Sequence, residues 1–427
     1  MSDLWKAESQ YHDFNCWPAE TGESYTPPAH YLPDSSECQN CGVCLSSCSS
    51  YYLEPIYEES PRGRVALLRQ TQLGQTNWDA ESLSHLNNCL QCRSCETVCP
   101  SQMDYQYWYD QTQQQLHSHQ PIKRLARLGF WLITHKRWRK ALLPAIALFQ
   151  HSGLIHVLEQ TSLLQKVGLD SISRYPVHPS LSEFATIYPV KKIRLRGRVA
   201  LFTGCLAEHF DQETLRASIK VLNHIGYEVV VPHEQTCCGA LHQHHGLSAQ
   251  SFMAQNIRTF YELEITAVIF AASACGAMLK EYPDQDSEMG GWFHRHLFDI
   301  HDFLLSHWPD NLTLAASNLR VAVHEPCSQR HVLKNSMSIH QLLAKIPELT
   351  LELFTDSHLC CGAGGSYMLR HPEKADQLRQ LKWEQVARLQ PDLVVSTNFG
   401  CALHLNSGQQ KGGLKFVHPI RLLADRL

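Results

Sequence analysis

The second half of the chain alternates short apolar runs with amphipathic stretches in a repeated order. Six runs are rich in Val, Ile, Leu and Phe, which is typical of strands buried on both faces of a sheet. Helical periodicity follows the first run of each set, over 215–225 and 339–345. The pattern therefore predicts two consecutive strand–helix–strand–helix–strand units, with strands over residues 198–202, 228–232, 267–270, 321–323, 349–354 and 393–396.

Cysteines follow these predicted strands at matching positions. The first copy contains Cys205, Cys237, Cys238 and Cys275, and the second contains Cys327, Cys360, Cys361 and Cys401. The first interval is 32 residues (205 to 237) in one copy and 33 (327 to 360) in the other. Open α/β sheets bind ligands beyond the carboxyl ends of their strands. One Cys-Cys-Gly sequence could be two buried apolar residues, but two copies with matched flanking cysteines favour two sets of metal ligands.

The first half contains two cysteine runs of a different kind. Cys38, Cys41, Cys44 and Cys48 form one C-x-x-C-x-x-C-x-x-x-C run, and Cys89, Cys92, Cys95 and Cys99, followed by Pro100, form the other. In bacterial ferredoxins with this spacing, three cysteines bind one [4Fe–4S] cluster and the fourth binds the neighbouring cluster. We therefore expect cluster one on Cys38, Cys41, Cys44 and Cys99, and cluster two on Cys89, Cys92, Cys95 and Cys48. Zinc, which usually takes two C-x-x-C pairs or a Cys/His mixture, is a remote alternative.

The linker between the two runs is long and helical in pattern, which favours a helical two-cluster domain over a compact β-ferredoxin. It contains Ser60-Pro61-Arg62-Gly63-Arg64, and a proline just after a serine is a common helix start. Arg62 and Arg64 either face solvent or contact a cofactor. A guanidinium beside a cluster would favour its reduced form and raise its reduction potential, and we favour this interpretation for one of the two arginines.

Composition narrows the function classes. The chain has 427 residues, a net charge of −4 and 17 cysteines, so we expect several domains, a reducing compartment and no nucleic-acid partner. Polar sequence follows Met1, and no apolar run reaches the roughly 18–20 residues that span a bilayer. These features predict a cytoplasmic protein. Cys16 belongs to no run, and we expect no ligand role for it.

The predicted organisation is an N-terminal arm (1–35), a helical domain for two [4Fe–4S] clusters (36–118), a basic helical connector (119–196), and two α/β repeats (197–310 and 318–427). In the connector, basic residues alternate with Leu, Phe and Trp between residues 123 and 143, without acidic residues. Such a helix could lie on an anionic membrane surface, dock an acidic partner, or pack on the neighbouring domain with its cationic face in solvent. The overall fold class is α/β with an α-helical N-terminal part.

The chain resembles the iron–sulfur subunits of glycolate oxidase, within the wider family of cysteine-rich CCG proteins. The resemblance is carried by residues 60–64, 89–100, 356–362 and 400–405. It implies electron transfer between partner FAD-binding subunits, which oxidise a 2-hydroxy acid, and the quinone pool. With the basic connector in addition, the expected location includes a peripheral position on the inner face of the plasma membrane. The sequence departs from the family in its longer N-terminal arm, in Ser49 where proline is usual, and in ending each repeat with one cysteine. The heterodisulfide reductase relatives end each repeat with C-x-x-C.

Two function classes are open from the sequence. In the first, the chain is an electron conduit and substrate oxidation occurs on a partner, because the chain contains no recognisable FAD- or NAD-binding motif. The substrate could then be glycolate, D-lactate or glycerol-3-phosphate. In the second, the chain itself performs thiol–disulfide or quinone chemistry at a repeat cluster, with a nearby histidine such as His242 or His245 supplying protons. A third possibility is an assembly scaffold that only holds partners together. The doubled cysteine runs argue against it.

Overall fold

The computed structural model describes residues 38–72, 79–119, 124–152, 175, 183–191, 193–283, 285–354, 358–407 and 413–427. The chain divides into two compact units, residues 1–113 and 114–427. The predicted N-terminal arm and Cys16 lie outside the described residues.

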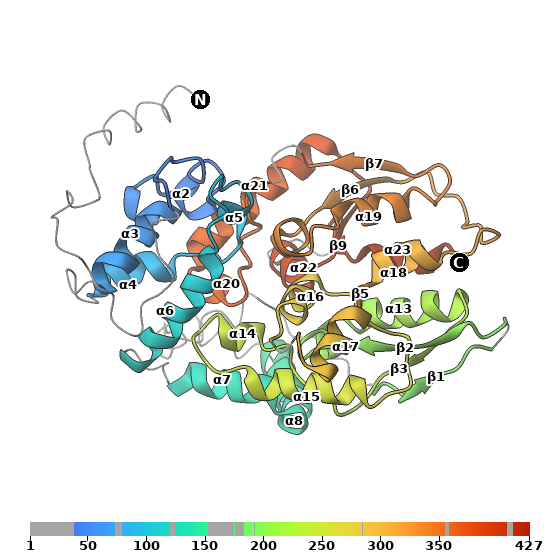
Figure 1. The fold of residues 1–427 in the computed structure, drawn as a ribbon. Helices are drawn as coiled ribbons and strands as arrows, with labels where there is room; N and C mark the ends of the chain where they lie inside the picture. Colours follow the sequence, from blue (N-terminus) through green and yellow to red (C-terminus); the bar gives the residue numbers. More distant parts are fainter. Residues whose placement is uncertain are drawn as a thin grey trace. The chain divides into compact units, whose positions relative to one another are not determined.

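The described part of the first unit is helical, as the cysteine linker predicts. Its elements are α2 (Ser49–Leu53), the 3-10 helix η2 (Tyr57–Glu59), α3 (Pro61–Gln72), α4 (Ala80–Asn87), α5 (Ser94–Thr97) and α6 (Tyr105–His119), which continues into the second unit (Figure 1). A small apolar core of Val65, Met103, Tyr105, Trp108 and Tyr109 packs against Cys38, Cys89, Cys95 and Cys99. The apolar core and the cysteines are therefore parts of the same packed structure.

The described part of the second unit contains two sheets, which include the six predicted strands. The first has the order β1-β3-β2-β4-β5 and the second the order β7-β6-β8-β9. All pairings are parallel except that of β1 with β3. Their bounds are β1 Ile187–Tyr188, β2 Gly197–Phe202, β3 Tyr227–Val230, β4 Ala267–Phe270, β5 Leu297–Asp299, β6 Arg320–His324, β7 Thr350–Leu353, β8 Leu393–Ser396 and β9 Phe416–Val417.

Each repeat has one more parallel strand than the sequence pattern predicts. β5 and β9 pair with the third strand of their repeat, at Phe298 with Ile269 and at Phe416 with Val394. These strands have three and two residues, too few to show a buried-strand pattern. The strand order of the four parallel strands is the same in both copies, which confirms the internal repeat.

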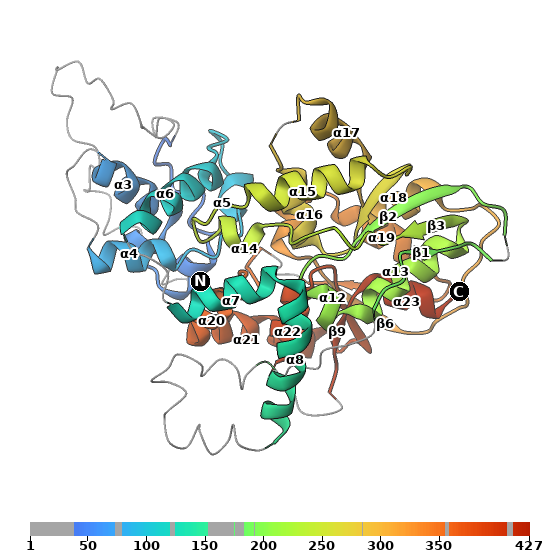
Figure 2. The same ribbon diagram turned by 90° about the horizontal axis from the view of Figure 1, so that it is seen from below.

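Helices cover both sheets (Figures 1 and 2). In the first copy they are α12 (Ala207–Phe210), α13 (Gln212–His224), α14 (Ala240–Gln243), α15 (Gln250–Tyr261), α16 (Ser273–Lys280), α17 (Glu288–His296) and α18 (Ile300–His307). In the second they are the π-helix η3 (Ser328–Leu333), α19 (Ser336–Leu343), α20 (Tyr367–Arg370), α21 (Pro372–Leu389), α22 (Phe399–Asn406) and α23 (Pro419–Asp425). One buried apolar cluster includes residues of both sheets, such as Val229 and Val395, so the repeats share a core.

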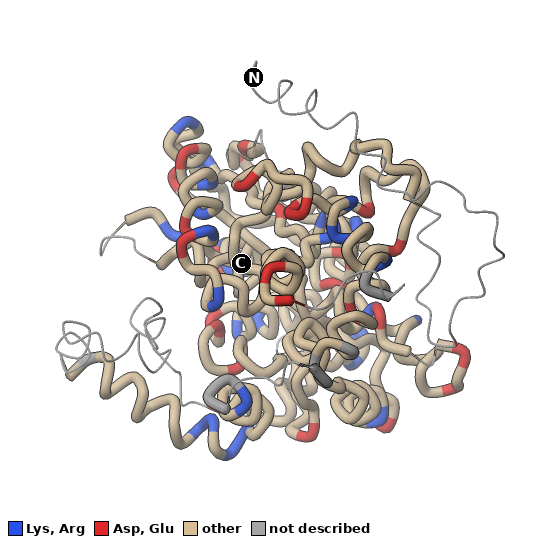
Figure 3. The backbone as a smooth tube through the Cα atoms, turned by 90° about the vertical axis from the view of Figure 1, so that its left-hand side faces the viewer, with Lys and Arg blue, Asp and Glu red and all other residues tan. Residues whose placement is uncertain are grey.

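The described part of the basic connector includes two helices, α7 (Arg124–Thr134) and α8 (Lys136–His151), which carry no acidic side chain (Figure 3). Arg139 is 4 % exposed, and it forms an ion pair with Glu208 at 3.1 Å, while Lys136 pairs with the same carboxylate at 2.7 Å. These two cations therefore anchor α8 on the first repeat. Arg127 and Arg137 are exposed. No helix of the described residues has the length and apolar character needed to cross a membrane.

His418 joins the two repeats through a buried imidazole. Its Nε2 lies 3.0 Å from the carbonyl oxygen of Ala271, and its Nδ1 accepts a hydrogen bond from Ile420 N at the start of α23. Burial and then the neighbouring His301 lower the pKa of His418 from 6.5 to about 3. The neutral ring uses one nitrogen as a donor and the other as an acceptor, and a proton on Nδ1 would remove the acceptor.

This imidazole predicts acid sensitivity of the second unit. The folded chain binds fewer protons at His418 than the unfolded chain, so the stability present above pH 6.5 is lost as the pH falls towards 3. Between pH 7 and pH 5, His418 should lower the free energy of unfolding by about 2 kcal/mol. Urea unfolding of the wild-type chain and of His418→Asn, which can still cap α23, checks this. Parallel pH slopes for the two proteins would contradict it.

Candidate iron–sulfur site

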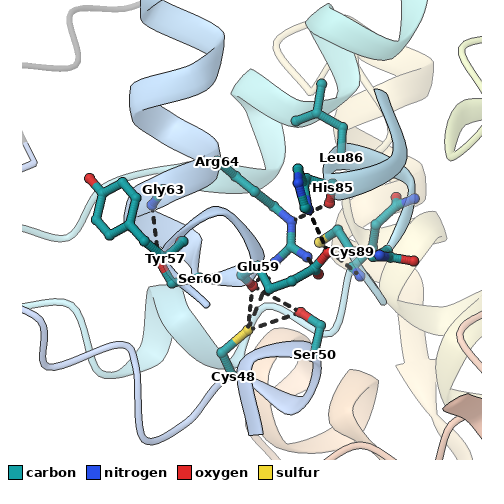
Figure 4. Close-up of polar contacts among 12 residues, drawn as sticks. Cys48, Ser50, Tyr57, Glu59, Ser60, Gly63, Arg64, His85, Leu86 and Cys89 are labelled. Atoms are coloured by element: carbon teal, nitrogen blue, oxygen red, sulfur yellow. Dashed lines mark hydrogen bonds and ion pairs between the residues drawn. The ribbon is translucent and has the colours of Figure 1, made fainter. Parts of the chain in front are cut away.

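The Ser60–Arg64 segment forms a tight turn that presents two arginines. Ser60 Oγ accepts a hydrogen bond from Gly63 N at 3.0 Å and donates one to the Tyr57 carbonyl at 2.6 Å. A Cβ on Gly63 would lie 2.0 Å from that same carbonyl oxygen. Glycine is therefore required where α3 packs against η2. The two arginines flank this glycine on the first turn of α3, as Figure 4 shows for Gly63 and Arg64.

Arg64 is fully buried and is held on several sides (Figure 4). Its Nη2 lies 2.6 Å from Glu59 Oε2, its Nε donates to the His85 carbonyl at 2.7 Å, and its Nη1 donates to the Glu59 carbonyl at 2.5 Å. The Nη1 atom also lies 3.9 Å from Cys48 Sγ. The guanidinium therefore stands beside a cysteine, as one of the two interpretations of this motif predicted.

Four cysteines line one cavity beside Arg64. They are Cys48 from the first run and Cys89, Cys92 and Cys95 from the second, the same four that the ferredoxin spacing assigns to cluster two. Gln91 N and Tyr105 Oη both approach Cys89 Sγ, at 3.4 and 3.7 Å. Donors directed at sulfur stabilise a thiolate.

Arg62 stands beside the other set. It donates to the Asn40 carbonyl at 3.3 Å, and its charge acts on the thiols of Cys38 and Cys44. Burial raises the pKa of Cys38, and the neighbouring thiols of Cys99 and Cys41 add to this rise. Each of the two arginines thus lies beside a different set of cysteines. The sequence analysis favoured a place beside a cluster for only one of them.

The two cysteine loops have the same backbone conformation. Asn40 and Gly42 have φ values of 51° and 79°, and Gln91 and Arg93, at the same places in the second run, have 52° and 60°. Non-glycine residues rarely adopt this left-handed conformation, which persists where the surrounding structure requires it. Here it directs the N–H groups of residues 40 and 91 to the sulfurs of Cys38 and Cys89.

The chemistry of these thiols fits a cationic metal group. Burial, and then the neighbouring thiols of Cys48 and Cys38, raise the pKa of Cys44 to about 12, and burial and then Cys92 raise the pKa of Cys95 well above its usual value. Thiolates this close together repel each other. A bound metal deprotonates its coordinating thiols. No three or more His, Cys, Asp or Glu of the described residues are arranged around a single ion. In a cubane cluster each thiolate binds a different iron, so four sulfurs surrounding a cavity suit the cluster.

Each repeat also brings its four cysteines together. Cys205 Sγ lies 3.4 Å from Cys237 Sγ, and Cys238 is within hydrogen-bonding reach of Cys237 and Cys275. In the second copy the same order recurs, with Cys327 next to Cys360, then Cys361, whose sulfur lies 2.9 Å from that of Cys401. No disulfide bond joins any described cysteine. The parallel strands therefore place both quartets at carboxyl ends, where the pattern predicted them.

The glycine of each Cys-Cys-Gly sequence has a defined role. Gly239 and Gly362 have φ values of 92° and 94°, and each turns its N–H towards the first cysteine of its pair. A Cβ on Gly239 would meet Ala249 at 2.7 Å, and one on Gly362 would meet the Ala375 carbonyl oxygen at 2.6 Å. Both positions require glycine for conformation and for space.

The two repeat sites differ in charge. Ala249 and Ala375 occupy equivalent places, and seven residues beyond them lie Asn256 and Lys382. Asn256 binds Thr236 N at 2.8 Å and the Cys237 carbonyl at 3.0 Å. Lys382 is 1 % exposed. Hydrogen bonds from Cys327 and Cys361, with the Lys382 charge in addition, hold the pKa of Cys360 well below its usual value. The second site therefore contains a buried cation where the first has a neutral amide.

Comparison with known proteins agrees with this architecture. The 4Fe-4S dicluster domain matches residues 37–104, and the cysteine-rich CCG domain matches residues 199–280 and 321–406. The probable glycolate oxidase iron–sulfur subunit of Bacillus subtilis is 30% identical over 418 residues, covering 91% of this chain and 93% of the relative. The chain belongs to the family of glycolate oxidase iron–sulfur subunits. The glycolate oxidase iron–sulfur subunit of Escherichia coli is 29% identical, with coverages of 91% and 93%.

More distant similarities cover part of the chain or the fold alone. Lactate utilization protein A of an Exiguobacterium species is 23% identical over 233 residues, covering 53% of this chain and 94% of the relative. The crystal structure of a hypothetical protein from Helicobacter pylori has a TM-score of 0.52 and 10% sequence identity, and the similarity covers 99% of this chain and 76% of that one. This structure shows a shared fold.

Several residues of the sites were absent from the sequence prediction. Glu59, His85, Asn88 and Lys382 stand beside cysteine sites but belong to no recognisable motif. The only sequence feature that marks any of them is the position of Glu59, immediately before the Ser60–Arg64 segment. A C-x-x-C ending would need a second cysteine three residues from Cys275 or Cys401. The residues at those positions are Ala272, Met278, Asn398 and His404. Of these, Asn398 donates to Cys401 Sγ at 3.3 Å, a hydrogen-bonding role in place of a ligand.

A methyl group at Gly276 should disrupt the first repeat site. Its Cβ would lie 1.9 Å from the Phe270 ring, which is 0 % exposed and cannot move aside. Gly276→Ala should destabilise the second unit by on the order of 3 kcal/mol. Gly129→Ala is the matched control, since nothing lies within 4 Å of its Cβ and alanine favours helix. Thermal unfolding of both variants tests this, and equal melting temperatures would refute the packing argument.

Proposed function

We propose that this chain is the electron-transfer subunit of a multi-subunit oxidoreductase that oxidises a 2-hydroxy acid. One [4Fe–4S] cluster would be held by Cys38, Cys41, Cys44 and Cys99, and a second by Cys89, Cys92, Cys95 and Cys48. The observation that carries the proposal is the pair of cysteine loops with matching backbone, each beside its own arginine. Such clusters accept and release single electrons. The chain's part is to bind them, donate hydrogen bonds to sulfur and balance their charge.

The repeat quartets are further cluster sites in this proposal. Cys205, Cys237, Cys238 and Cys275 would form one set, and Cys327, Cys360, Cys361 and Cys401 the other. Their support is the geometry common to the two copies, in which the sulfurs of each quartet lie in one connected group. The strand ends and the two glycines of positive φ position these thiols, and Asn398 and Lys382 distinguish the second set from the first.

The partners belong to the same proposal. FAD-binding subunits would oxidise glycolate or a related 2-hydroxy acid and pass electrons to this chain, which would deliver them towards quinone. Support comes from the names of the Bacillus and Escherichia relatives, both subunits of glycolate oxidase. D-lactate and glycerol-3-phosphate are the alternative substrates. Thiol–disulfide or quinone chemistry at a repeat cluster is the alternative mechanism.

A peripheral position on the inner face of the plasma membrane is supported by the outer surface of α7 and α8. Five apolar side chains on these helices are exposed by 37 % or more, namely Leu128, Trp131, Trp138, Leu142 and Leu148. The exposed cations Arg127 and Arg137 lie on the same two helices. This combination suits the interface of an anionic bilayer.

The deciding experiment is an assay of the complex purified anaerobically with its native partners. Dye reduction is measured with glycolate, D-lactate and glycerol-3-phosphate side by side. Activity on a 2-hydroxy acid, with flavin in a co-purifying chain, is the expected result. Activity with glycerol-3-phosphate alone would assign a different substrate. A chain without a flavoprotein partner that reduces disulfides by itself would overturn the conduit function.

Cys92→Ser should separate the two halves of the reaction. Because Cys92 lines the cavity of the second set, its loss should lower electron transfer to an added acceptor by at least about tenfold. Reduction of the partner's flavin by substrate should continue. Stopped-flow absorbance of the flavin, with and without acceptor, distinguishes the two steps. Loss of flavin reduction in a correctly assembled complex would contradict the conduit function.

Cys361→Ser should impair the later step of electron delivery, because Cys361 lies between Cys360 and Cys401 in the second quartet. We expect loss of about four irons per chain, the content of one cubane cluster, together with slower reduction of quinone. Iron analysis and a quinone-reduction assay measure both effects. Cys16→Ser is the control, since no ligand role is expected for it. Unchanged iron content would show that the second repeat is structural.

A further inference from the structure

Glu59 is a buried carboxylate on which three side chains converge (Figure 4). Arg64 Nη2 lies 2.6 Å from its Oε2, Asn88 Nδ2 donates to its Oε1 at 2.7 Å, and His85 Nδ1 lies 2.8 Å from the same Oε1. The Glu59 side chain is 1 % exposed. Burying a carboxylate is costly unless it is paired and hydrogen-bonded, and this one is both.

The partner of this carboxylate is the guanidinium that stands beside the second cysteine set. Arg64 Nη1 lies 3.9 Å from Cys48 Sγ, and both Arg64 and Cys48 line the cavity that contains Cys89, Cys92 and Cys95. The positive charge of Arg64 stabilises negative charge in that cavity, and the Glu59 carboxylate opposes it. The second set therefore lies beside an ion pair, and the Glu59 carboxylate partly cancels the positive charge of the Arg64 guanidinium.

The first set has a different environment. Arg62 acts on the thiols of Cys38 and Cys44, donates to the Asn40 carbonyl and lies over the Tyr57 ring, with 5.5 Å between its Cζ and the ring centroid. Within the described part of the first unit, it forms no ion pair. Among the described residues, the buried acid that pairs with Arg64 therefore has no counterpart beside Arg62.

We propose that Glu59 is a positioning residue that sets the reduction potential at the second cysteine set through Arg64. The inference rests on the proposed ligand set of Cys48, Cys89, Cys92 and Cys95. A reduced cluster carries one more negative charge than an oxidised one, so a nearby cation raises the potential and a nearby anion lowers it. Glu59 therefore keeps the potential of this cluster below the value that Arg64 alone would give.

The test is a redox titration of the complex, purified anaerobically with its native partners and followed by electron paramagnetic resonance. Glu59→Gln keeps the side-chain shape, and Arg64 stays held by the backbone oxygens of residues 59 and 85. This variant should raise the midpoint potential of one cluster by about 59 mV, which corresponds to a tenfold change in the equilibrium constant for one-electron reduction. Arg64→Gln should lower the potential of the same cluster, and Glu59→Gln/Arg64→Gln should return it close to wild type.

Arg62→Gln is the matched control, because it should lower the potential of the other cluster and leave this one unchanged. Removing both members of a buried pair is less damaging than removing one, so the double variant is available if a single variant does not fold. If only Arg64→Gln folds, the midpoint potential of the double variant should be about 59 mV higher than that of Arg64→Gln. If only Glu59→Gln folds, it should be about 59 mV lower than that of Glu59→Gln.

A failure of the role of Glu59 is distinguishable from a failure of the ligand set. Clusters that are present in wild type and in Glu59→Gln at equal potentials would overturn the role of Glu59 and leave the proposed function intact. A lowered potential in Glu59→Gln would overturn it in the same way. A wild-type complex without a reducible cluster at Cys48, Cys89, Cys92 and Cys95 would overturn the ligand set and the inference together.

Discussion

The structure depends on one constraint, the cost of holding several cysteine thiolates close together in a low-dielectric interior. Thiolates a few ångströms apart repel each other, and burial removes the water that would screen them. Burial and then the neighbouring thiols raise the pKa values of Cys44 and Cys95. Each cysteine site therefore needs positive charge, N–H donors and space for a metal group. The surrounding helices, loops and strands supply these in two different ways.

The first unit uses side-chain cations and left-handed loops. One short segment, Ser60–Arg64, serves both cysteine sets because Gly63 allows α3 to approach η2 closely and the flanking arginines face different cysteines. The second unit uses strand ends and glycines. Gly239 and Gly362 turn their N–H groups to sulfur, and parallel strands bring cysteines that lie far apart in sequence to one sheet edge. Both arrangements donate to sulfur, but the first depends more on buried charge.

Duplication of the α/β unit has preserved geometry while charge has diverged. Both quartets have the same order of contacts, and both glycines are pressed against an equivalent alanine. Asn256 and Lys382, at equivalent places, put a neutral amide in the first site and a buried cation in the second, while the first site has its cation from α8, where the charge of Arg139 acts on Cys205. Two sites with the same ligands and different charge would have different reduction potentials.

The sequence by itself determined the cysteine sets, the repeat and the fold class, because spacing and apolar runs are local properties. Three strands of each repeat were predicted within a few residues, whereas β5 and β9 were missed since two or three residues carry no pattern of their own. Only the tertiary structure decided which charges stand beside which cysteines. Arg62 and Arg64 are two residues apart yet face different sets, and Arg139 is buried against Glu208 although Arg137 on the same helix is exposed. Lys382 acts on Cys360 through folding alone. The pairing of Arg139 with Glu208 depends on contact between segments that are distant in sequence, and no local pattern encodes it.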